Sequence, residues 1–466
     1  MALVKAGDSR RSQSKFISVG ERLSAPVPAV PLALFRIAFG LLMFASTMRF
    51  WLNGWVYDFY VLPGVHFTYL GFGWVTPLSE AGMYAVFGVM LLATLLVTFG
   101  LFYRVAMVGF FLLFTYVELI DKTFYLNHYY FVSLLSFLLI FLPLNTRLSL
   151  NARLGFSPYR ETVPAWTLYS VRLQLVLVYF FAGVAKLNPD WLFAAQPLRI
   201  WLRANTELPI IGGLFDYVWV AYAMSWAGLL YDLTIPLFLL WRKTRPFAYL
   251  VVIAFHVLTA LLFPIGMFPW IMLVSTLIFF SVEDYRAALG WLRVPGMMSR
   301  LTSSPLSRAS FSKSKRISSS LTPLVLSLFF IFQIGMCLRH YAYPGSVLWH
   351  EQGYRFSWRV MLAEKTGSAT FRITQDGNTQ TVYPSEYLTP QQVKQMSFQP
   401  DMILQFAHLL ASEAGGDAQV YADVWVSVNG RPSERLVDPD IDLAAEPYGL
   451  AERRWITSNF TFARSL

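Results

Sequence analysis

The stretch LYSVRLQLVLVYFFAGVAKLNPDW at residues 168–191 stays almost free of charge until it meets Lys186 and the polar segment that follows. A helix needs about 20 apolar residues to cross a bilayer, so residues 168–187 are predicted to span a membrane. Eight further apolar runs bring the predicted number of spans to nine. The nine runs are 31–51, 82–102, 104–119, 129–145, 168–187, 219–241, 246–264, 267–281 and 321–338.

The composition indicates a membrane protein with a soluble part attached. Of the 466 residues, 56% are hydrophobic, 17% are aromatic and 14% are charged, whereas soluble domains carry about 25% charged residues. These values exclude a disordered chain, a disulfide scaffold and a conventional cytosolic enzyme. The net charge of +10 does not predict nucleic-acid binding, because much of the basic charge lies in short loops, where it sets topology.

The distribution of Lys and Arg predicts the orientation in the membrane. With the N-terminus in the cytoplasm, most loop lysines and arginines fall on the cytoplasmic side, as the positive-inside rule requires. Nine spans then place the C-terminus outside the cytoplasm. The predicted parts are a cytoplasmic segment (1–30), a bundle of about eight helices (31–295), a basic Ser-rich cytoplasmic linker (296–320), the last transmembrane helix (321–338) and an extracytoplasmic domain (339–466).

The last 128 residues have the pattern of a β-rich domain. Hydrophobic residues alternate with polar ones over 355–362 and over 420–428, which predicts two strands. Asp376-Gly377 predicts a tight turn between strands, and Thr389-Pro390 predicts the start of a helix that runs to about Ala411. The predicted fold class is therefore an α-helical polytopic membrane protein with a C-terminal β-rich domain.

Lys186 is the first candidate for chemistry, because ionisable groups at a membrane edge are costly to place there. A lysine in an apolar pocket loses solvation, which favours the neutral amine and makes it available as a base. The alternative is a lysine whose head group reaches the interface only to stay hydrated.

A second cluster is ELIDKTFYLNHYY at 118–130, predicted on the same side as Lys186. Asn127 could hydrogen-bond a polar substrate, and His128 could carry protons. Asp121 and Lys122 could instead form an ion pair with each other, as part of an ordinary interfacial loop.

Two further ionisable residues lie inside predicted spans, His256 and Asp232. A lone buried carboxylate must find a partner or stay protonated, so Asp232 is expected to pair with an Arg or His of another helix or to hold the fold. A structural role is also favoured for His256 on position alone. The sequence has no HExxH, CxxC or Gly-rich phosphate loop, so no metal or nucleotide site is expected.

Several motifs resemble one known family. They are DKTFYLNHYY (121–130), VYFFAGVAKLNPDW (178–191), GLLYDLT (228–234), FHVLTALLFPIGMF (255–268), GYRFSWRVML (353–362), PDMILQFAHLL (400–410), VYADVWVSVNGR (420–431) and DPDIDLA (438–444). In this order they are similar to the vitamin K-dependent γ-glutamyl carboxylases and their bacterial homologues, the HTTM-domain proteins. The resemblance extends from about residue 30 to residue 460.

The resemblance implies a reaction and a set of residues. Members of the family oxidise reduced vitamin K (a menaquinol or phylloquinol) with O2 to the epoxide, and use the strong base formed on the way to carboxylate glutamate with CO2. The family's base maps onto Lys186, its Asn-His pair onto Asn127 and His128, and its second histidine onto His256. Tyr179 and Trp191 lie in the Lys186 motif, and we assign them to quinone binding.

The implied partners are membrane lipid, a lipid-soluble quinone and a glutamate-containing exported polypeptide, in the inner (cell) membrane of a bacterium. One departure is Ala185, which stands where the family often has a second lysine. Because no cysteine can pair with Cys337, the disulfide of the animal enzymes cannot form. Three alternatives stay open at this point: quinol epoxidation without carboxylation, a transporter, and a non-catalytic interaction protein.

Overall fold

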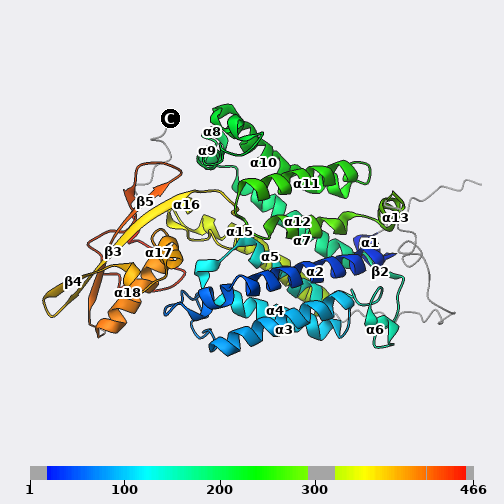
Figure 1. Cartoon of the computed structure of the whole chain (residues 1–466), viewed down its shortest axis with the longest axis horizontal. Helices are drawn as coiled ribbons and strands as arrows, with labels where there is room; N and C mark the ends of the chain where they lie inside the picture. The colour runs from blue at the N-terminus through cyan, green and yellow to red at the C-terminus, as the bar shows by residue number, and fades with distance from the viewer. Residues whose placement is uncertain (1–17, 292–320, 416, 458–466) are drawn as a thin grey trace, which may run out of the picture.

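The computed structural model describes residues 18–291 and 321–457, apart from residue 416. A bundle of helices forms one part of the molecule, and a domain with a sheet and two helices caps one end of it (Figure 1). The predicted linker 296–320 lies outside the described residues, as do residues 1–17 of the predicted N-terminal segment.

Among the described residues, seven helices are long and apolar enough to cross a membrane. A further helical pair, Phe268–Phe279 with Val282–Ala288, is bent by 116° and gives an eighth span only if it is counted as one. The seven are α2 (Val30–Leu52), α3 (Glu80–Phe99), α4 (Tyr103–Ile120), α7 (Ala165–Ala185), α10 (Val218–Leu240), α11 (Arg245–Leu262) and the segment Leu321–Ala342, which contains α15 (Leu321–Leu338).

The predicted count of nine spans is therefore not confirmed. The fourth run forms α5 (Asn127–Ile140), which is 14 residues long and followed by a turn containing Pro143. The eighth run, 267–281, contains α12 (Phe268–Thr276) and a short turn, and it ends just before α13 (Val282–Trp291). Apolar composition predicted that these segments are buried, but it did not predict where the helices end.

Short elements connect the long helices. They are α1 (Val19–Ser24), β1 (Pro26–Pro28), η1 (Tyr57–Val61), η2 (Lys122–Phe124), α6 (Leu150–Arg153), β2 (Thr162–Pro164), α8 (Pro189–Phe193), α9 (Leu198–Arg203), η3 (Gly212–Asp216), η4 (Leu277–Phe279), η5 (Arg339–Ala342), α16 (Val347–His350) and η6 (Pro384–Glu386). Strands β1 and β2 pair with each other antiparallel.

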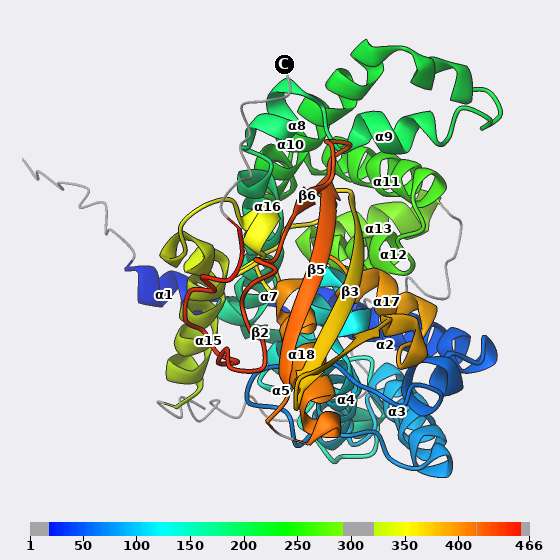
Figure 2. The same ribbon diagram turned by 90° about the vertical axis from the view of Figure 1, so that its left-hand side faces the viewer.

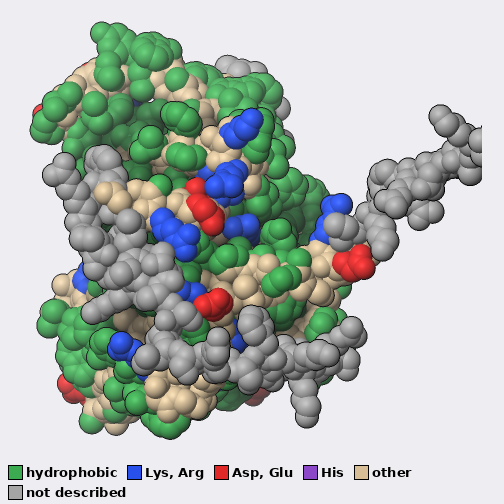
Figure 3. Space-filling view, turned by 90° about the vertical axis from the view of Figure 1, so that its right-hand side faces the viewer, with side chains coloured by type: hydrophobic (Ala, Val, Ile, Leu, Met, Phe, Trp, Pro, Cys, Tyr) green, Lys and Arg blue, Asp and Glu red, His purple; other side chains and the backbone are tan. Residues whose placement is uncertain are grey.

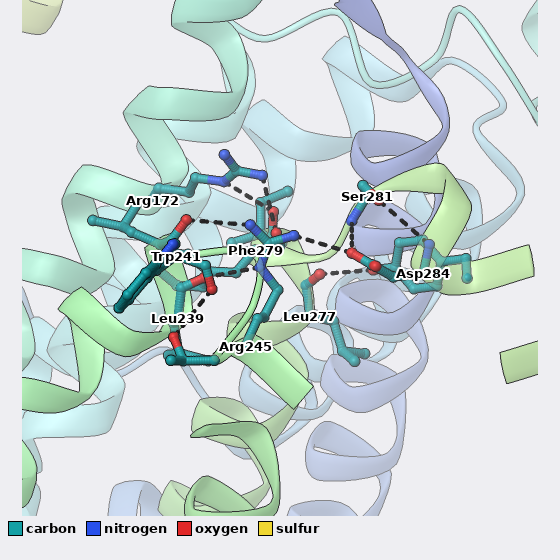
Figure 4. A network of polar contacts seen from close by, with 12 residues as sticks. Arg172, Leu239, Trp241, Arg245, Leu277, Phe279, Ser281 and Asp284 are labelled. Atoms are coloured by element: carbon teal, nitrogen blue, oxygen red, sulfur yellow. Dashed lines mark hydrogen bonds and ion pairs between the residues drawn. The ribbon is translucent and has the colours of Figure 1, made fainter. Parts of the chain in front are cut away.

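Arginine side chains tie helix ends together at the end of the bundle away from the sheet. Arg245 forms an ion pair of 3.0 Å with Asp284 and donates to the carbonyl of Leu239, while Arg172 donates to the carbonyls of Ile278 and Phe279 (Figure 4). These guanidinium groups satisfy carbonyls that lack helical partners at a helix end. Figure 3 shows that Lys and Arg side chains gather in the middle of this end, surrounded by hydrophobic ones.

Two glutamines join α15 to α7 inside the bundle. The side-chain amides of Gln174 and Gln333 donate to each other's oxygens over 2.8 and 2.9 Å, and both residues are buried. In an apolar medium an amide must find a partner of this kind. The pair therefore fixes the last helix against the bundle.

The capping domain is built on a four-stranded antiparallel sheet of order β4-β3-β5-β6. Its strands are β3 (Lys365–Gln375), β4 (Asn378–Val382), β5 (Gln419–Val428) and β6 (Glu434–Arg435), and its helices are α17 (Pro390–Met396) and α18 (Pro400–Ala414). The even-numbered residues of β5 are buried, as the alternation over 420–428 predicted. Phe371 of β3 meets Phe406 of α18 edge to face at 4.9 Å, which places α18 on the buried face of the sheet.

The predicted turn at Asp376-Gly377 is confirmed, since it joins β3 to β4. Two other predictions for this domain are wrong. The helix that begins after Thr389 stops at Met396, because Pro400 favours an extended Gln399 and starts a new helix. Residues 355–362 form turns and not a strand.

We expect the Gln174–Gln333 pair to stabilise the bundle by about 1 kcal/mol. Gln174→Leu alone leaves the amide of Gln333 buried without its partner and should lower the free energy of unfolding. The double variant Gln174→Leu/Gln333→Leu should recover most of the loss. A double-mutant cycle on thermal unfolding in nanodiscs measures this, and additive losses would contradict the pair.

Candidate functional site

One cavity in the bundle collects most of the predicted site residues. It lies between α7, α10, α11 and α12, at the end that the sheet domain covers. Its walls are mainly apolar and aromatic. Five predicted residues line it: Tyr179, Lys186, Trp191, Asp232 and His256.

Lys186 is held at the end of α7 by a buried ion pair. Its Nζ lies 2.6 Å from Oδ2 of Asp232 and 3.3 Å from the carbonyl of Ala182. The ring of Trp191 lies over the same nitrogen, with its centroid at 5.2 Å. Lys186 is only 6% exposed, so its head group does not reach the interface.

The partner of Lys186 corrects the prediction for Asp232. The expected partner was an Arg or His of another helix, and the partner is Lys186 at the end of α7, 46 residues away; the pair is compatible with the expected structural role. Close packing of α7 on α10 brings the two together, because a Cβ on Gly183 would lie 2.6 Å from the Leu233 side chain. A larger residue at 183 would push the helices apart.

Three polar groups form a second cluster, and two of them, Tyr179 and His256, line the cavity. The hydroxyls of Tyr179 and Tyr231 lie 3.4 Å from each other, and each lies 3.4 Å from Nε2 of His256. All three side chains are buried, and Nδ1 of His256 has no hydrogen-bond partner among the described residues. Tyr231 escaped the sequence analysis, although it directly precedes Asp232 in the motif GLLYDLT.

Asn127 and His128 do not line this cavity. The ring of Phe268 stands between the two histidines, 6.0 Å from His128 and 5.8 Å from His256. Asn127 donates to the carbonyl of Arg359 and accepts from the hydroxyl of Tyr125. The Asn-His motif therefore lies behind the wall and not in it.

Two family models match the chain. Residues 24–283 match the HTTM domain, and residues 318–461 match the vitamin K-dependent gamma-carboxylase lumenal domain. The chain belongs to the vitamin K-dependent carboxylase family. No solved structure matched it. The protein is thus a membrane protein of this family; its helical part is the HTTM domain, and its sheet-containing part is the lumenal domain.

The predicted pair of Asp121 with Lys122 is wrong, because each binds the lumenal domain instead. Asp121 accepts a hydrogen bond of 2.9 Å from Gln392, and Nζ of Lys122 lies 2.9 Å from Asp401. Arg355 reaches the same carboxylate oxygen at 2.6 Å. The loop 118–130 therefore fastens the HTTM domain to the lumenal domain.

The charges in this fastening shift one another's pKa. Burial lowers the pKa of Lys122 to about 8. Burial alone would raise the pKa of Asp401, but the charges of Arg355 and Lys122 outweigh it and hold that pKa well below its usual value. Asp401 therefore stays ionised at any ordinary pH.

A second fastening lies next to the cavity. Asp190 is buried and accepts from Asn429 over 2.6 Å and from Arg431 over 2.8 Å. Asp190 directly precedes Trp191, which covers Lys186. The turn after β5 in the lumenal domain is thus bound to the segment that carries the cavity wall.

The segment 355–362, predicted as a strand, closes the cavity. Its backbone has a positive φ at Phe356, Trp358 and Met361, which breaks the regular alternation of a strand. Val360 and Met361 line the cavity. Nearby, Nε1 of Trp201, another lining residue, donates to Glu364 over 2.6 Å. The lumenal domain is therefore a lid on the HTTM cavity.

Among the described residues, no group of three or more His, Cys, Asp and Glu side chains is arranged to hold a metal ion. The polar groups in the cavity wall and directly behind it are an amine, a carboxylate, two tyrosine hydroxyls and an imidazole. These groups suit proton transfer and hydrogen bonding to a polar ring substituent.

Asp401→Asn should destabilise the protein by about 3 kcal/mol, because it leaves Lys122 and Arg355 buried without their counter-charge. The stabilisation by ionised Asp401 exists above the ordinary carboxyl pKa of 3.8 and is lost as the pH falls further. The free energy of unfolding of the variant should therefore fall less steeply with decreasing pH than that of the unaltered protein.

Asp423→Asn is the matched control. Asp423 pairs with Arg435 at 3.0 Å in an exposed position, and such a pair contributes at most about 1 kcal/mol. Thermal unfolding in nanodiscs from pH 7 to pH 3 gives both values. Equal losses in the two variants would contradict the role of Asp401.

Proposed function

We propose that this protein is an integral-membrane γ-glutamyl carboxylase-like enzyme. It couples oxygenation of a reduced quinone to its epoxide with carboxylation of glutamate in an exported polypeptide. We place it in the inner (cell) membrane of a bacterium, with the N-terminus in the cytoplasm and the lumenal domain outside. The basic end of the bundle, opposite the lid, supports this orientation (Figure 3).

The observation that carries the proposal is the Lys186–Asp232 pair in an otherwise apolar cavity. A quinol has a flat apolar ring system and two polar oxygens. The cavity offers aromatic and aliphatic walls to the first, and its amine, carboxylate, hydroxyl and imidazole groups to the second. The residues present therefore fit a reduced vitamin K, which supplies the reducing equivalents for O2 and the strong base that attacks glutamate.

We assign the role of base to Lys186 together with Asp232. As an ammonium–carboxylate pair they have room for one more proton. Lys186 passes a proton to Asp232 across the 2.6 Å contact and takes one from a quinol hydroxyl. The proton passed to Asp232 and the proton taken from the quinol hydroxyl then both lie on the Lys186–Asp232 pair, so no isolated charge is left in the apolar cavity.

The remaining groups of the site have binding and proton-carrying roles in this proposal. Tyr179 and His256 hydrogen-bond a quinone oxygen, together with Tyr231, and Trp191 covers the amine of Lys186. We assign proton transfer to His128, which the ring of Phe268 separates from the cavity. Its Nε2 is buried and has no hydrogen-bond partner among the described residues, so it is free to take a proton. Asn127 holds the lid at the carbonyl of Arg359.

The lid has a chemical purpose. A base strong enough to remove a γ-proton from glutamate would be quenched by water, so the reaction needs a closed apolar container. Val360 and Met361 provide that closure from the lumenal side. The quinone enters from the bilayer, CO2 and O2 diffuse through the apolar bundle, and the polypeptide arrives at the lid.

Lys186→Ala should abolish both products, because the proton acceptor is removed from the quinol. The assay incubates protein in nanodiscs with reduced vitamin K, O2, labelled bicarbonate and a short glutamate-rich peptide. Epoxide and fixed label are read together. Lys243→Ala, at an exposed lysine in the turn between α10 and α11, is the control. Epoxide without fixed label in the unaltered protein would support quinol epoxidation alone. Neither product from folded protein would overturn the proposal.

Asp232→Asn should lower the rate of epoxide formation by about a hundredfold or more, because an amide cannot take the proton that Lys186 passes on. Asp232→Glu keeps the carboxylate and should recover part of the rate. The single-turnover rate with saturating reduced vitamin K separates this effect from weaker quinone binding. Equal rates for the Asn and Glu variants would contradict the relay.

A further inference from the structure

The edge of β3 in the lumenal domain is only half covered. Strand β4 pairs with β3 from Gln375 back to Phe371, where it ends at Val382. On the other side, β5 pairs with β3 over its full length, down to Lys365. The outer edge of residues 365–370 therefore has no neighbouring strand.

Along a strand, backbone groups of successive residues point to opposite neighbours, and this alternation shows which backbone groups face the open edge. The carbonyls of Val420 and Val424 accept from Leu443 and Leu436, on the side of β5 away from β3. The odd-numbered residues of β5 must then bond β3, and their partners are the even-numbered residues of β3. Lys365, Gly367 and Ala369 consequently point their N–H and C=O groups outward. Among the described residues, these groups have no hydrogen-bond partner.

A groove that is partly open to solvent lies beside residues 365–367 of this edge. Helix α17 lies beside β3 on the side away from β5 and forms the opposite wall (Figure 2). The wall contributes apolar side chains such as Leu388 and Val393, and the charged residues of the lining are both lysines. Lys365 is paired with Glu351, whereas Lys394 is exposed and has no ion-pair partner within the described parts of the chain.

The groove leads to the cavity. Lys365, at one end of it, follows Glu364, whose carboxylate accepts from Trp201 in the cavity wall. Met361, four residues before Lys365, lines the cavity itself. An extended chain that lies along β3 from Ala369 to Lys365 covers about 13 Å and ends beside the lid.

We propose that this groove binds an extended, acidic polypeptide segment by strand addition to the free edge of β3. Unpaired main-chain groups favour an extended backbone as the partner, and Lys394 together with the lack of carboxylates in the lining favours an acidic one. The inference rests on the proposed function and deepens it, because the bound segment is the acceptor polypeptide and β3 guides it toward the lid.

Amide hydrogen exchange tests the groove without catalysis. The full protein in nanodiscs is mixed with a fluorescein-labelled peptide of four Glu-Ala-Val repeats. We expect the amides of Gly367 and Ala369 to become protected at saturating peptide. Protection at Thr379 and Thr381 instead, on the outer edge of β4, would overturn the assignment, and so would no protection at either edge.

Ala369→Pro removes one outward N–H and places a ring at the free edge of β3, two residues beyond the groove-lining Gly367, while the bonds to β5 remain. It should weaken peptide binding roughly tenfold, as expected for one lost main-chain bond and steric hindrance. Thr381→Pro removes an outward N–H on β4, outside the groove, and should leave the affinity unchanged. An equal effect of the two prolines would contradict the groove.

Lys394→Glu tests the charge argument. It should weaken binding at least tenfold at low salt and reduce the salt dependence, whereas Arg372→Glu, on the exposed face of the sheet, should change neither. Failure of the peptide-binding groove and failure of the proposed enzyme activity are distinguishable. If the peptide protects β3 but neither epoxide nor fixed label is formed, the groove is supported and the proposed activity is overturned. If Ala369→Pro carboxylates fully at an unchanged peptide KM, the groove alone is overturned.

Discussion

A buried ion pair, Lys186 with Asp232, sets the conditions for the rest of the molecule. Moving an ammonium and a carboxylate out of water costs several kcal/mol per ion, and here their mutual contact of 2.6 Å, the carbonyl of Ala182 and the face of Trp191 offset that cost. The contact exists only because α7 and α10 pack closely at Gly183. The close crossing of α7 and α10 is therefore also the condition for the Lys186–Asp232 contact.

A reactive group at the end of a bundle would be exposed to water without a cover. The lumenal domain supplies the cover through contacts from two sides, at Asp190 and at Lys122. Both contacts use buried charges, which bind strongly only in the correct geometry. The lid is thus positioned by charge and sealed by the apolar side chains of Val360 and Met361.

The sequence predicted the parts of this structure that depend on local pattern. The lysine at the end of an apolar run, the alternation in β5 and the turn at Asp376-Gly377 are of this kind. The partners of Asp232, Lys122 and Asp190 were not predictable, because they depend on how distant segments cross. The strand expected at 355–362 was wrong for a different reason. Turns with positive φ at Phe356 and Trp358 bury the consecutive residues Ser357, Trp358 and Arg359, although apolar and polar residues alternate in the sequence there.

One short segment connects the lumenal domain to Lys186. Lys186 faces the cavity, Asp190 binds Arg431 of the lumenal domain, and the next residue, Trp191, covers the Lys186 amine. A shift of the lumenal domain therefore moves Asp190 and, with it, the ring over the Lys186 amine. Such a shift changes the shielding of the ion pair without any direct contact between the lid and Asp232. The position of the lumenal domain and the shielding of the ion pair therefore depend on the same two consecutive residues, Asp190 and Trp191.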